Sequence, residues 1–554
     1  MAEGVAYARS RGARVLVAIN TFPRAGEQAL WHRAVADARR AGAHAVILAD
    51  PGLLAHAAEA HPDLRLHLSV QAAAANPDAI NFYAEAFGIR RVVLPRVLTV
   101  EEITAINREI DIETEVFVFG GLCVMAEGRC SLSSWATGLS PNMNGVCSPA
   151  SHVVYDEVSG HNEARLGGLL IHRTPKGAPA PYPTLCKGCF TAPATETGPV
   201  QTGHIFEDPV SLDATELIPR LQKAGVTALK IEGRQRSRAY VAQVVRAFRA
   251  AVEAAEAGAP MPAGLLAKLT EGQSATTGAY AKTWSPARRV VIGEWVCSKR
   301  LPFWQDEIPG AVECLLAAGK DVALSTLALI TLRRERRQTA YLFDAGIPVE
   351  IADLGALRHL PEGAPFQVGP TVNVYNEATL EWLARKGATR ICLPPELPLS
   401  SVAVLARAGR AAGVAVEVWG HGRAPLAISG RCYHARLHDR SKDSCQFVCG
   451  EDPDGRDVET LDGRRFLTVN GVQTLGHAHS TVAGQIAELA GIGVSAVRLS
   501  PQTGNFKAVV RLYDDLVKQR SAQAEAVARL QALLPGAAFA DGFLAGAPGL
   551  RRTL

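Results

Sequence analysis

The sequence predicts an α/β protein made of two tandem TIM-barrel-like (β/α) units. Short runs of Val, Ile and Leu alternate with longer amphipathic, Ala- and Arg-rich stretches, and one such pattern occurs twice along the chain. Unbroken apolar runs are typical of buried parallel strands, with helices between them. The runs expected to form strands include residues 15–19, 45–48, 91–94, 115–119, 228–231, 322–325, 390–393, 416–419 and 496–499.

An internal repeat sets the domain organisation. Residues 76–95, which end in Leu-Pro, are echoed by residues 376–394, and the stretch ending in Gly-Arg-Cys130 is echoed by the stretch ending in Gly-Arg-Cys432. A third pair, around Lys230 and Arg498, keeps the same order. We therefore predict two domains, residues 1–285 and 286–554, with the seam between Pro260 and Arg289, where Gly, Thr, Ser and Pro are frequent.

Composition and charge narrow the function classes. The 554 residues are 48% hydrophobic, which excludes a disordered chain, and 58 basic against 54 acidic residues give a net charge of only +4. This balance argues against electrostatic binding of nucleic acid as the main activity, and we expect no DNA partner. No signal peptide and no run of about 18 apolar residues occurs, so we expect a cytoplasmic protein without a transmembrane segment.

The cysteines are the sharpest chemical signal. Eight of the 11 fall into two groups of four, one in each half: Cys123, Cys130, Cys147 and Cys186, then Cys297, Cys432, Cys445 and Cys449. In a reducing compartment such groups are typical of metal ligands. Four thiolates suit a [4Fe–4S] cluster or tetrahedral zinc, and the spacing also allows reduced structural cysteines.

The two groups are not copies of each other. In the register of the repeat only Cys130 and Cys432 coincide, so we expect that ligands were recruited separately in each half. The other three cysteines, Cys189, Cys314 and Cys392, are predicted to have no role, and the last two lie in apolar runs where a small hydrophobic side chain fits.

Two motifs resemble the peptidase U32 family. The first is Phe-Gly-Gly-Leu-Cys-Val-Met-Ala-Glu-Gly-Arg-Cys within residues 115–147, and the second is Lys-Ile-Glu-Gly-Arg-Gln-Arg-Ser-Arg-Ala-Tyr at residues 230–240. The first half is most similar to the UbiU branch of that family. The second half is similar to the UbiV branch, through Gly-Glu-Trp-Val-Cys-Ser-Lys-Arg at residues 293–300 and Ser-Gly-Arg-Cys at residues 429–432. The chain thus resembles a fusion of two proteins that form a heterodimer.

The resemblance implies oxygen-independent hydroxylation of the aromatic ring of a ubiquinone precursor. It implies a [4Fe–4S] cluster on each cysteine quartet, prephenate as the oxygen donor, a prenylated phenol as the substrate and two halves that pack on each other. A UbiT-like lipid-binding protein with a sterol-carrier fold is the implied companion. The alternatives are a U32-type hydroxylase of RNA bases and, third, a U32 peptidase, although no Gly-x-Ser-x-Gly or His-Glu-x-x-His motif is present.

The resemblance also implies a departure from the family pattern. Family members begin with a strand and a helix before the part that matches residues 11–22. We therefore expect the first unit to lack its opening βα segment and the second unit to lack part of its own. Either the true start lies upstream, which is the simpler explanation for the N-terminus, or the barrels are incomplete and the two halves complement each other.

Polar residues near predicted strand ends are candidates for substrate binding. They are Ser69, Gln71, Arg96, Lys230, Glu232, Arg234 and Arg236. Barrel enzymes place their sites at the carboxyl ends of strands, and paired basic side chains suit a dicarboxylate such as prephenate. An ion pair between Glu232 and Arg234 is the alternative. We expect His67 to be a satisfied polar residue near a strand, and no residue is assigned a catalytic role.

Overall fold

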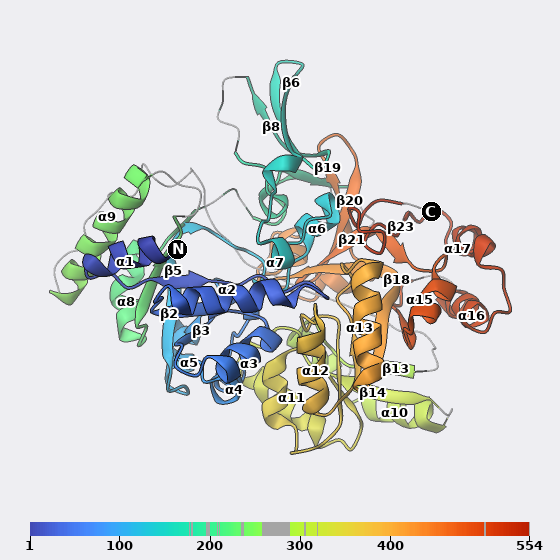
Figure 1. Cartoon of the computed structure of the whole chain (residues 1–554). Helices are drawn as coiled ribbons and strands as arrows, with labels where there is room; N and C mark the ends of the chain where they lie inside the picture. The colour runs from blue at the N-terminus through green and yellow to red at the C-terminus, as the bar shows by residue number, and fades with distance from the viewer. Residues whose placement is uncertain are drawn as a thin grey trace.

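The structure is a computed structural model of a mixed α/β protein (Figure 1). It describes residues 1–554 except 177, 179–180, 195–199, 208, 210, 234–237, 258–288, 304–305, 318–319, 504–505 and 553–554. The predicted seam between the halves therefore lies mostly outside the described residues. No described helix combines the length and apolar character needed to cross a membrane.

The first half builds a parallel sheet in the order β1-β2-β3-β4-β5, with β12 parallel and β11 antiparallel to β5. A separate antiparallel sheet, β6-β7-β8, projects at the top of Figure 1. The elements are α1 (Ala2–Ser10), β1 (Leu16–Ala18), α2 (Gln28–Arg40), β2 (Ala45–Leu48), α3 (Pro51–Ala60), β3 (Leu66–Leu68), α4 (Pro77–Phe87), β4 (Arg91–Val93), α5 (Val100–Asn107), β5 (Glu113–Gly121), α6 (Leu132–Thr137), α7 (Pro141–Asn144), β6 (Val153–Val158), β7 (His161–Leu166), β8 (Leu169–Pro175), β9 (Phe190–Ala192), β10 (Gln201–Gly203), β11 (Ser211–Asp213), α8 (Ile218–Lys223), β12 (Ala228–Ile231) and α9 (Arg238–Glu256).

The second half builds a parallel run of strands, β13-β14-β15-β16-β17-β18, with β22 parallel to β18. Its elements are β13 (Arg289–Ile292), α10 (Ile308–Ala317), β14 (Asp321–Ser325), α11 (Arg333–Phe343), β15 (Val349–Ile351), β16 (Phe366–Val368), α12 (Glu377–Arg385), β17 (Ala388–Cys392), α13 (Leu399–Ala411), β18 (Ala415–Ile428), α14 (Tyr433–Arg436), β19 (Arg456–Thr460), β20 (Arg465–Asn470), β21 (Gln473–Thr481), α15 (Ile486–Ile492), β22 (Ala496–Leu499), α16 (Phe506–Val517), α17 (Ala526–Leu533) and β23 (Phe539–Ala540).

Each of the nine apolar runs expected to form strands lies on a strand of the structure, and the α/β class is confirmed. Within the described residues, no strand pairing joins β1 to β12 or β13 to β22, so closure into TIM barrels is not confirmed. In the sequence register of the repeat, β14 to β17 correspond to β1 to β4. Strand β13 then has no described counterpart in the first half, and the two units differ by one opening strand.

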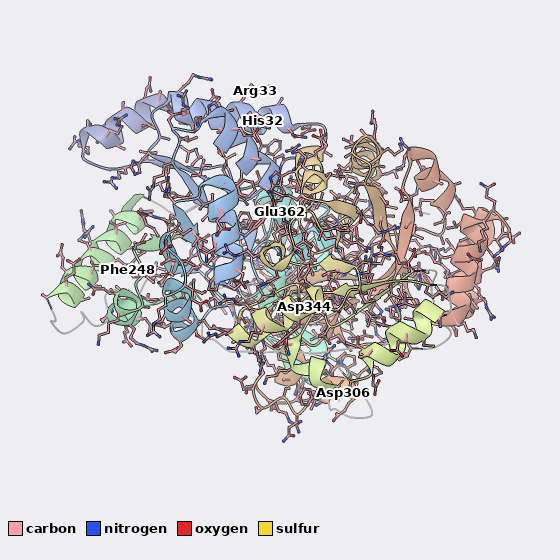
Figure 2. The ribbon with its side chains drawn as sticks, turned by 90° about the horizontal axis from the view of Figure 1, so that it is seen from below. His32, Arg33, Phe248, Asp306, Asp344 and Glu362 are labelled. Carbon is pink, nitrogen blue, oxygen red and sulfur yellow. The ribbon has the colours of Figure 1, made fainter. Side chains whose placement is uncertain are left out.

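The sheet of the second half contains strands from the first half. Beyond β18 the order continues antiparallel through β21, β20 and β19 to β9 and β10, which belong to the first half. Trp135 on α6 extends the connection, because its indole N–H donates to the carbonyl of Phe466 on β20 at 2.9 Å. Figure 2 shows the halves side by side, with Phe248 on α9 in the first half and Asp344 and Glu362 in the second.

The halves meet through an approximate two-fold arrangement of equivalent helices. Helix α3 packs on α12. Helix α4, which corresponds to α12 in the repeat, packs on the 3₁₀ turn η6 (Leu354–His359), which corresponds to α3. Gly52 makes the first contact close: a Cβ there would lie 2.7 Å from the Thr379 nitrogen. Gly355 makes the second contact close, since its Cβ would lie 2.9 Å from Ala79. Both positions exclude a side chain without movement of the partner helix.

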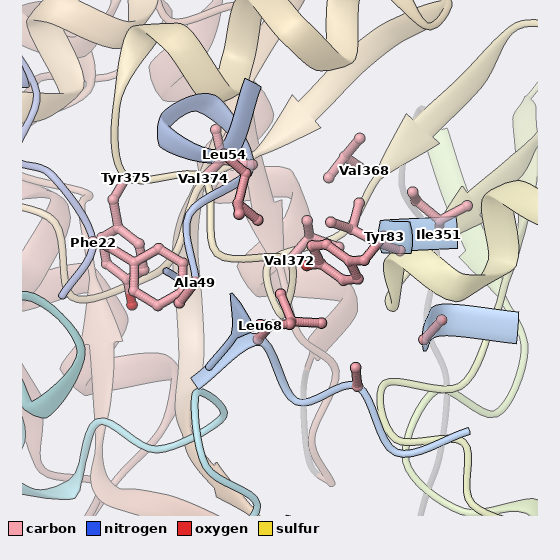
Figure 3. Packing of buried hydrophobic residues seen from close by; sticks show 14 of the residues in the cluster. Phe22, Ala49, Leu54, Leu68, Tyr83, Ile351, Val368, Val372, Val374 and Tyr375 are labelled. Carbon is pink, nitrogen blue, oxygen red and sulfur yellow. The ribbon is translucent and has the colours of Figure 1, made fainter. Parts of the chain in front are cut away.

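One hydrophobic core runs through both halves. Phe22, Leu68 and Tyr83 from the first half share a buried cluster with Val372 and Tyr375 from the second (Figure 3). The rings of Phe22 and Tyr375 lie 5.2 Å apart. Because burying apolar surface is the main favourable term in folding, the halves stabilise one another.

Ion pairs frame this interface. Arg336 on α11 donates two hydrogen bonds to the Asp78 carboxylate on α4, at 2.8 and 2.9 Å, and His359 lies 3.1 Å from the same carboxylate. Burial opposes the charge, but the hydrogen bonds from His359 and Arg336 lower the pKa of Asp78 from 3.8 to about 2.

We predict that Asp78→Asn lowers the free energy of unfolding by about 2 kcal/mol at neutral pH. The folded pKa is below the unfolded pKa, so this contribution is complete above about pH 4 and disappears as pH falls towards 2. Urea unfolding of both proteins between pH 7 and pH 2 measures the difference. A gap that stays constant down to pH 2 would contradict the ion-pair account.

Candidate metal centres

The first quartet gathers where β5 ends. Cys123 follows that strand closely, Cys130 pairs in a β-bridge with Ala427 of the other half, and Cys186 lies in the 3₁₀ turn η3 (Leu185–Lys187). Cys147 is the exposed member of the group. Burial raises the pKa of the Cys123 and Cys130 thiols, and nearby Cys147 and Cys186 raise both further. The four thiols predicted from sequence order are therefore close enough to interact.

The second quartet is entirely buried. Cys297 follows β13, Cys432 is the N-cap of α14, and Cys445 and Cys449 lie around the turn η7 (Val448–Gly450). The Cys432 sulfur accepts the backbone N–H of Ala435 at 3.0 Å. Burial raises the pKa of Cys432, and Cys449, Cys445 and Cys297 raise it further in that order.

All eight thiols are free of disulfides, and the donor set fits a metal. The second site offers four buried sulfurs and the first offers three partly buried sulfurs and the exposed Cys147. Buried thiolates without a partner would be costly, and protonated thiols would form no strong interaction. Soft sulfur donors suit iron or zinc and not magnesium or calcium. The eight cysteines therefore remain predicted metal ligands.

The three remaining cysteines differ in setting. Cys392 is buried in β17, as expected of a small apolar residue, whereas Cys314 is exposed on α10, so burial does not explain it. Cys189 is half-buried, and its N–H donates to the Ile171 carbonyl at 2.9 Å. Burial alone raises the pKa of Cys189.

Of the candidate substrate residues, Ser69, Gln71 and Arg96 lie just beyond the carboxyl ends of β3 and β4. Ser69 accepts hydrogen bonds from the Asn20 amide at 3.2 Å and the Gln71 N–H at 3.3 Å. The Gln71 side-chain oxygen is buried without a hydrogen-bond partner in the described structure. Its backbone oxygen would lie 1.9 Å from a Cβ at Gly128, whose φ is +75°, so only glycine fits before Arg129 and Cys130.

Arg96 connects these residues to the first quartet. Its Nε donates to Glu127 at 2.7 Å, and its Nη1 lies 3.3 Å from Glu232. Burial opposes its charge, but Glu127, Cys123 and Glu232 raise the pKa of Arg96. Glu232 thus pairs with Arg96, while Arg234 and Arg236 lie outside the described residues.

Lys230 belongs to a different polar network. Its ammonium donates to Glu115 at 2.7 Å, and Glu115 also pairs with Arg91 at 3.2 Å, near the amino ends of β4 and β5. The second half repeats this network with Arg498 and Glu417. The recurrence of the pair at equivalent positions indicates a structural ion pair, and the role of Lys230 in substrate binding stays a prediction.

His67 is buried in β3. Its Nε2 accepts a hydrogen bond from Arg65 at 3.0 Å, while Nδ1 has no hydrogen-bond partner in the described structure. Burial, then Arg91 and Arg65, lower the pKa of His67 to about 4. Only one ring nitrogen is satisfied, which corrects part of the expectation for this residue.

Sequence reasoning missed the arginines of the two Gly-Arg-Cys motifs. Arg129 crosses to the second half and pairs with Asp353 at 3.0 Å, with both side chains more than nine-tenths buried. Arg431 crosses in the other direction and pairs with the fully buried Glu207. The motif repeats in the sequence and could have pointed to a shared role, although its partners lie far away along the chain.

A cavity of about 40 Å³ lies between the halves beside Cys130. It is lined by Asn142 from the first half and by Tyr375 and Glu396 from the second. Burial raises the pKa of Glu396, whose carboxylate accepts hydrogen bonds from Tyr375, Ser140 and Asn142. The volume suits ordered water and is too small for an aromatic substrate.

A model of the family described as "Peptidase family U32" matches residues 1–284 and again 276–553. The tRNA hydroxylation protein P of Escherichia coli is 34% identical over 279 residues, which are 48% of this chain and 61% of that protein. The tRNA hydroxylation protein P1 of Bacillus subtilis is 31% identical, with 46% and 53% covered. The 23S rRNA 5-hydroxycytidine C2501 synthase of E. coli is 33% identical over 155 residues, with 28% and 23% covered. The chain thus spans at most about three fifths of these curated relatives.

We predict that Cys186→Ser lowers the iron of protein purified without oxygen by about half, from roughly eight atoms per chain. Cys189→Ser is the matched control, because that thiol lies three residues away and should leave iron unchanged. Iron analysis and the visible absorption spectrum measure the effect. Loss of iron in the Cys189 variant alone would mean that the ligand is misassigned.

We predict that Arg129→Ala lowers the free energy of unfolding by about 3–5 kcal/mol, because it leaves Asp353 buried without its partner. Replacing Arg129 and Asp353 together by Met and Leu should recover much of that loss. Arg39→Ala breaks an exposed ion pair with Asp63 and should have little effect. The measurement is urea unfolding of the unaltered protein and the three variants. Equal losses of unfolding free energy for the Arg129 and Arg39 variants would contradict a stabilising role of the buried Arg129–Asp353 pair.

Proposed function

Because this chain belongs to the peptidase U32 family over both of its halves, we propose that it is a hydroxylase of an aromatic ring or base that works without molecular oxygen. The observation that carries the proposal is the pair of thiol quartets, one in each half. Cys130 and Cys186 of the first pack against a buried hydrophobic cluster, and all four thiols of the second lie within another. The names of the relatives from E. coli and B. subtilis support hydroxylation as the reaction class.

The two quartets are the proposed ligands of two [4Fe–4S] clusters, which supply one-electron redox chemistry when bound. The chain's own residues exclude water around Cys297, Cys432, Cys445 and Cys449, which are buried. At the first quartet, Arg96 keeps a positive charge beside Cys123.

Arg96 is the proposed anchor for an anionic oxygen donor such as prephenate. Its partner Glu127 is 3% exposed and held at 2.7 Å, whereas Glu232 is 38% exposed and lies at 3.3 Å. A carboxylate of the donor can therefore replace Glu232 and leave Glu127 in place. Ser69 and Gln71, at the neighbouring strand end, are within the same group of candidate binding residues.

The first candidate substrate class is an RNA base. It is supported by the names of the relatives, which refer to tRNA hydroxylation and to 5-hydroxycytidine of 23S rRNA. These matches cover at most 48% of this chain and therefore concern about one half of it.

The second candidate is the ring of a prenylated phenol on the route to ubiquinone. Two observations favour this candidate: the halves share one core, and each half has its own quartet. The likeness to UbiU and UbiV proteins, which pair with each other, accounts for the shared core and for the two quartets. The net charge of +4 also favours a substrate other than a polyanion. A UbiT-like lipid-binding companion and a closed barrel in each half belong to this proposal.

Mass spectrometry of cells grown without oxygen, with and without the gene, tests the proposal. Hydroxylated nucleosides missing from tRNA or rRNA would support the first class, and missing hydroxylated quinone intermediates would support the second. Complementation with Cys130→Ala should fail, while Cys189→Ser should succeed. If both pools are unchanged in the deletion strain, the hydroxylase proposal is wrong.

A further inference from the structure

A cluster of three potential metal ligands lies outside both quartets. One ring nitrogen of His434, one of His438 and a carboxylate oxygen of Asp452 all lie within 4.8 Å of one another. The two histidines are four residues apart, His434 in helix α14 and His438 just after its end, with nearly parallel rings whose centres lie 5.5 Å apart. Asp452 follows the turn η7 and faces both.

The contacts of His434 require a proton or a metal ion between its ring and Asp452. Its Nδ1 lies 3.2 Å from the Val469 carbonyl oxygen, which only accepts, so Nδ1 carries the hydrogen. In a neutral ring Nε2 then presents a lone pair to Asp452 Oδ2 at 2.9 Å. Two acceptors at this distance repel unless a proton or a metal ion lies between them.

His438 distinguishes these two choices. Its Nε2 is buried, has no hydrogen-bond partner in the described residues and lies 3.8 Å from the same Asp452 oxygen. A second proton on His434 would satisfy one nitrogen only. A metal ion between the three groups would satisfy both nitrogens and the oxygen. The Val469 carbonyl orients His434 in the way that outer-shell acceptors orient metal-bound histidines.

We propose that His434, His438 and Asp452 bind one zinc ion. Two imidazoles and one carboxylate suit zinc, which takes three protein ligands and a water, whereas magnesium and calcium prefer oxygen donors alone. The ion joins α14, which Cys432 caps, to the segment that follows Cys449. The ion therefore fixes Cys432 relative to Cys449. The proposed zinc site does not depend on which metal the second quartet holds.

Zinc analysis of the whole chain, purified without oxygen, tests the site. The protein is incubated with one equivalent of zinc and dialysed, and we expect about one zinc per chain, with nitrogen and oxygen neighbours at about 2.0–2.1 Å in zinc X-ray absorption. His438→Asn and Asp452→Asn should each lower retained zinc at least tenfold. His477→Asn is the matched control, because His477 makes a single 3.1 Å contact to Asp457 and should keep the zinc.

Each outcome decides for or against the site. Sulfur neighbours at about 2.3 Å would place the zinc on cysteines and overturn the proposal, as would full zinc retention in both variants. Circular dichroism checks that the variants fold. If the His438→Asn variant does not fold, Asp452→Asn supplies the measurement. Iron content is measured in parallel, so an absent cluster and an absent zinc site are distinguished.

Discussion

The short antiparallel pairing between residues 126–131 and the end of β18 is the contact on which the candidate sites depend. Ala126 N–H donates to Ile428 at 2.8 Å, and Ile428 N–H donates to Arg129 at 3.1 Å. This pairing places Cys130 beside Ala427, only a few residues before Cys432. The arginines next to both cysteines then cross in opposite directions to buried carboxylates. Each cysteine loop is thus shaped by the other half of the chain.

Much of the parallel framework was predictable because its information is local. The apolar runs at residues 45–48, 228–231 and 496–499 match their strands residue for residue. The first is buried along its whole length, as expected of a strand that is apolar on both faces, whereas the other two are partly buried and each contain one basic residue. Strands of three residues that contain a polar side chain, such as β15 and β16, carry too little pattern to be recognised. The quartets were predictable in membership because cysteine is rare and its grouping follows the repeat.

The contacts across the halves were not predictable, because they join residues far apart in sequence. Nothing near Arg129 indicates Asp353, and nothing near Phe190 indicates that β9 extends a sheet of the second half. The pairing of Lys230 with Glu115 likewise needed the packed strands to be seen. Such partners are fixed by three-dimensional arrangement and leave no short-range pattern.

The matched contacts of Gly52 and Gly355 have a consequence for how such a chain changes over time. In a symmetric dimer of identical subunits one substitution alters both copies of a contact at once. Here the two copies are encoded separately, so a substitution at Gly52 alters the contact with α12 and leaves Gly355 and α4 as they were. Each half can therefore diverge at half the energetic cost that an identical dimer would meet, which allows two unlike cysteine sets on one ancestral scaffold.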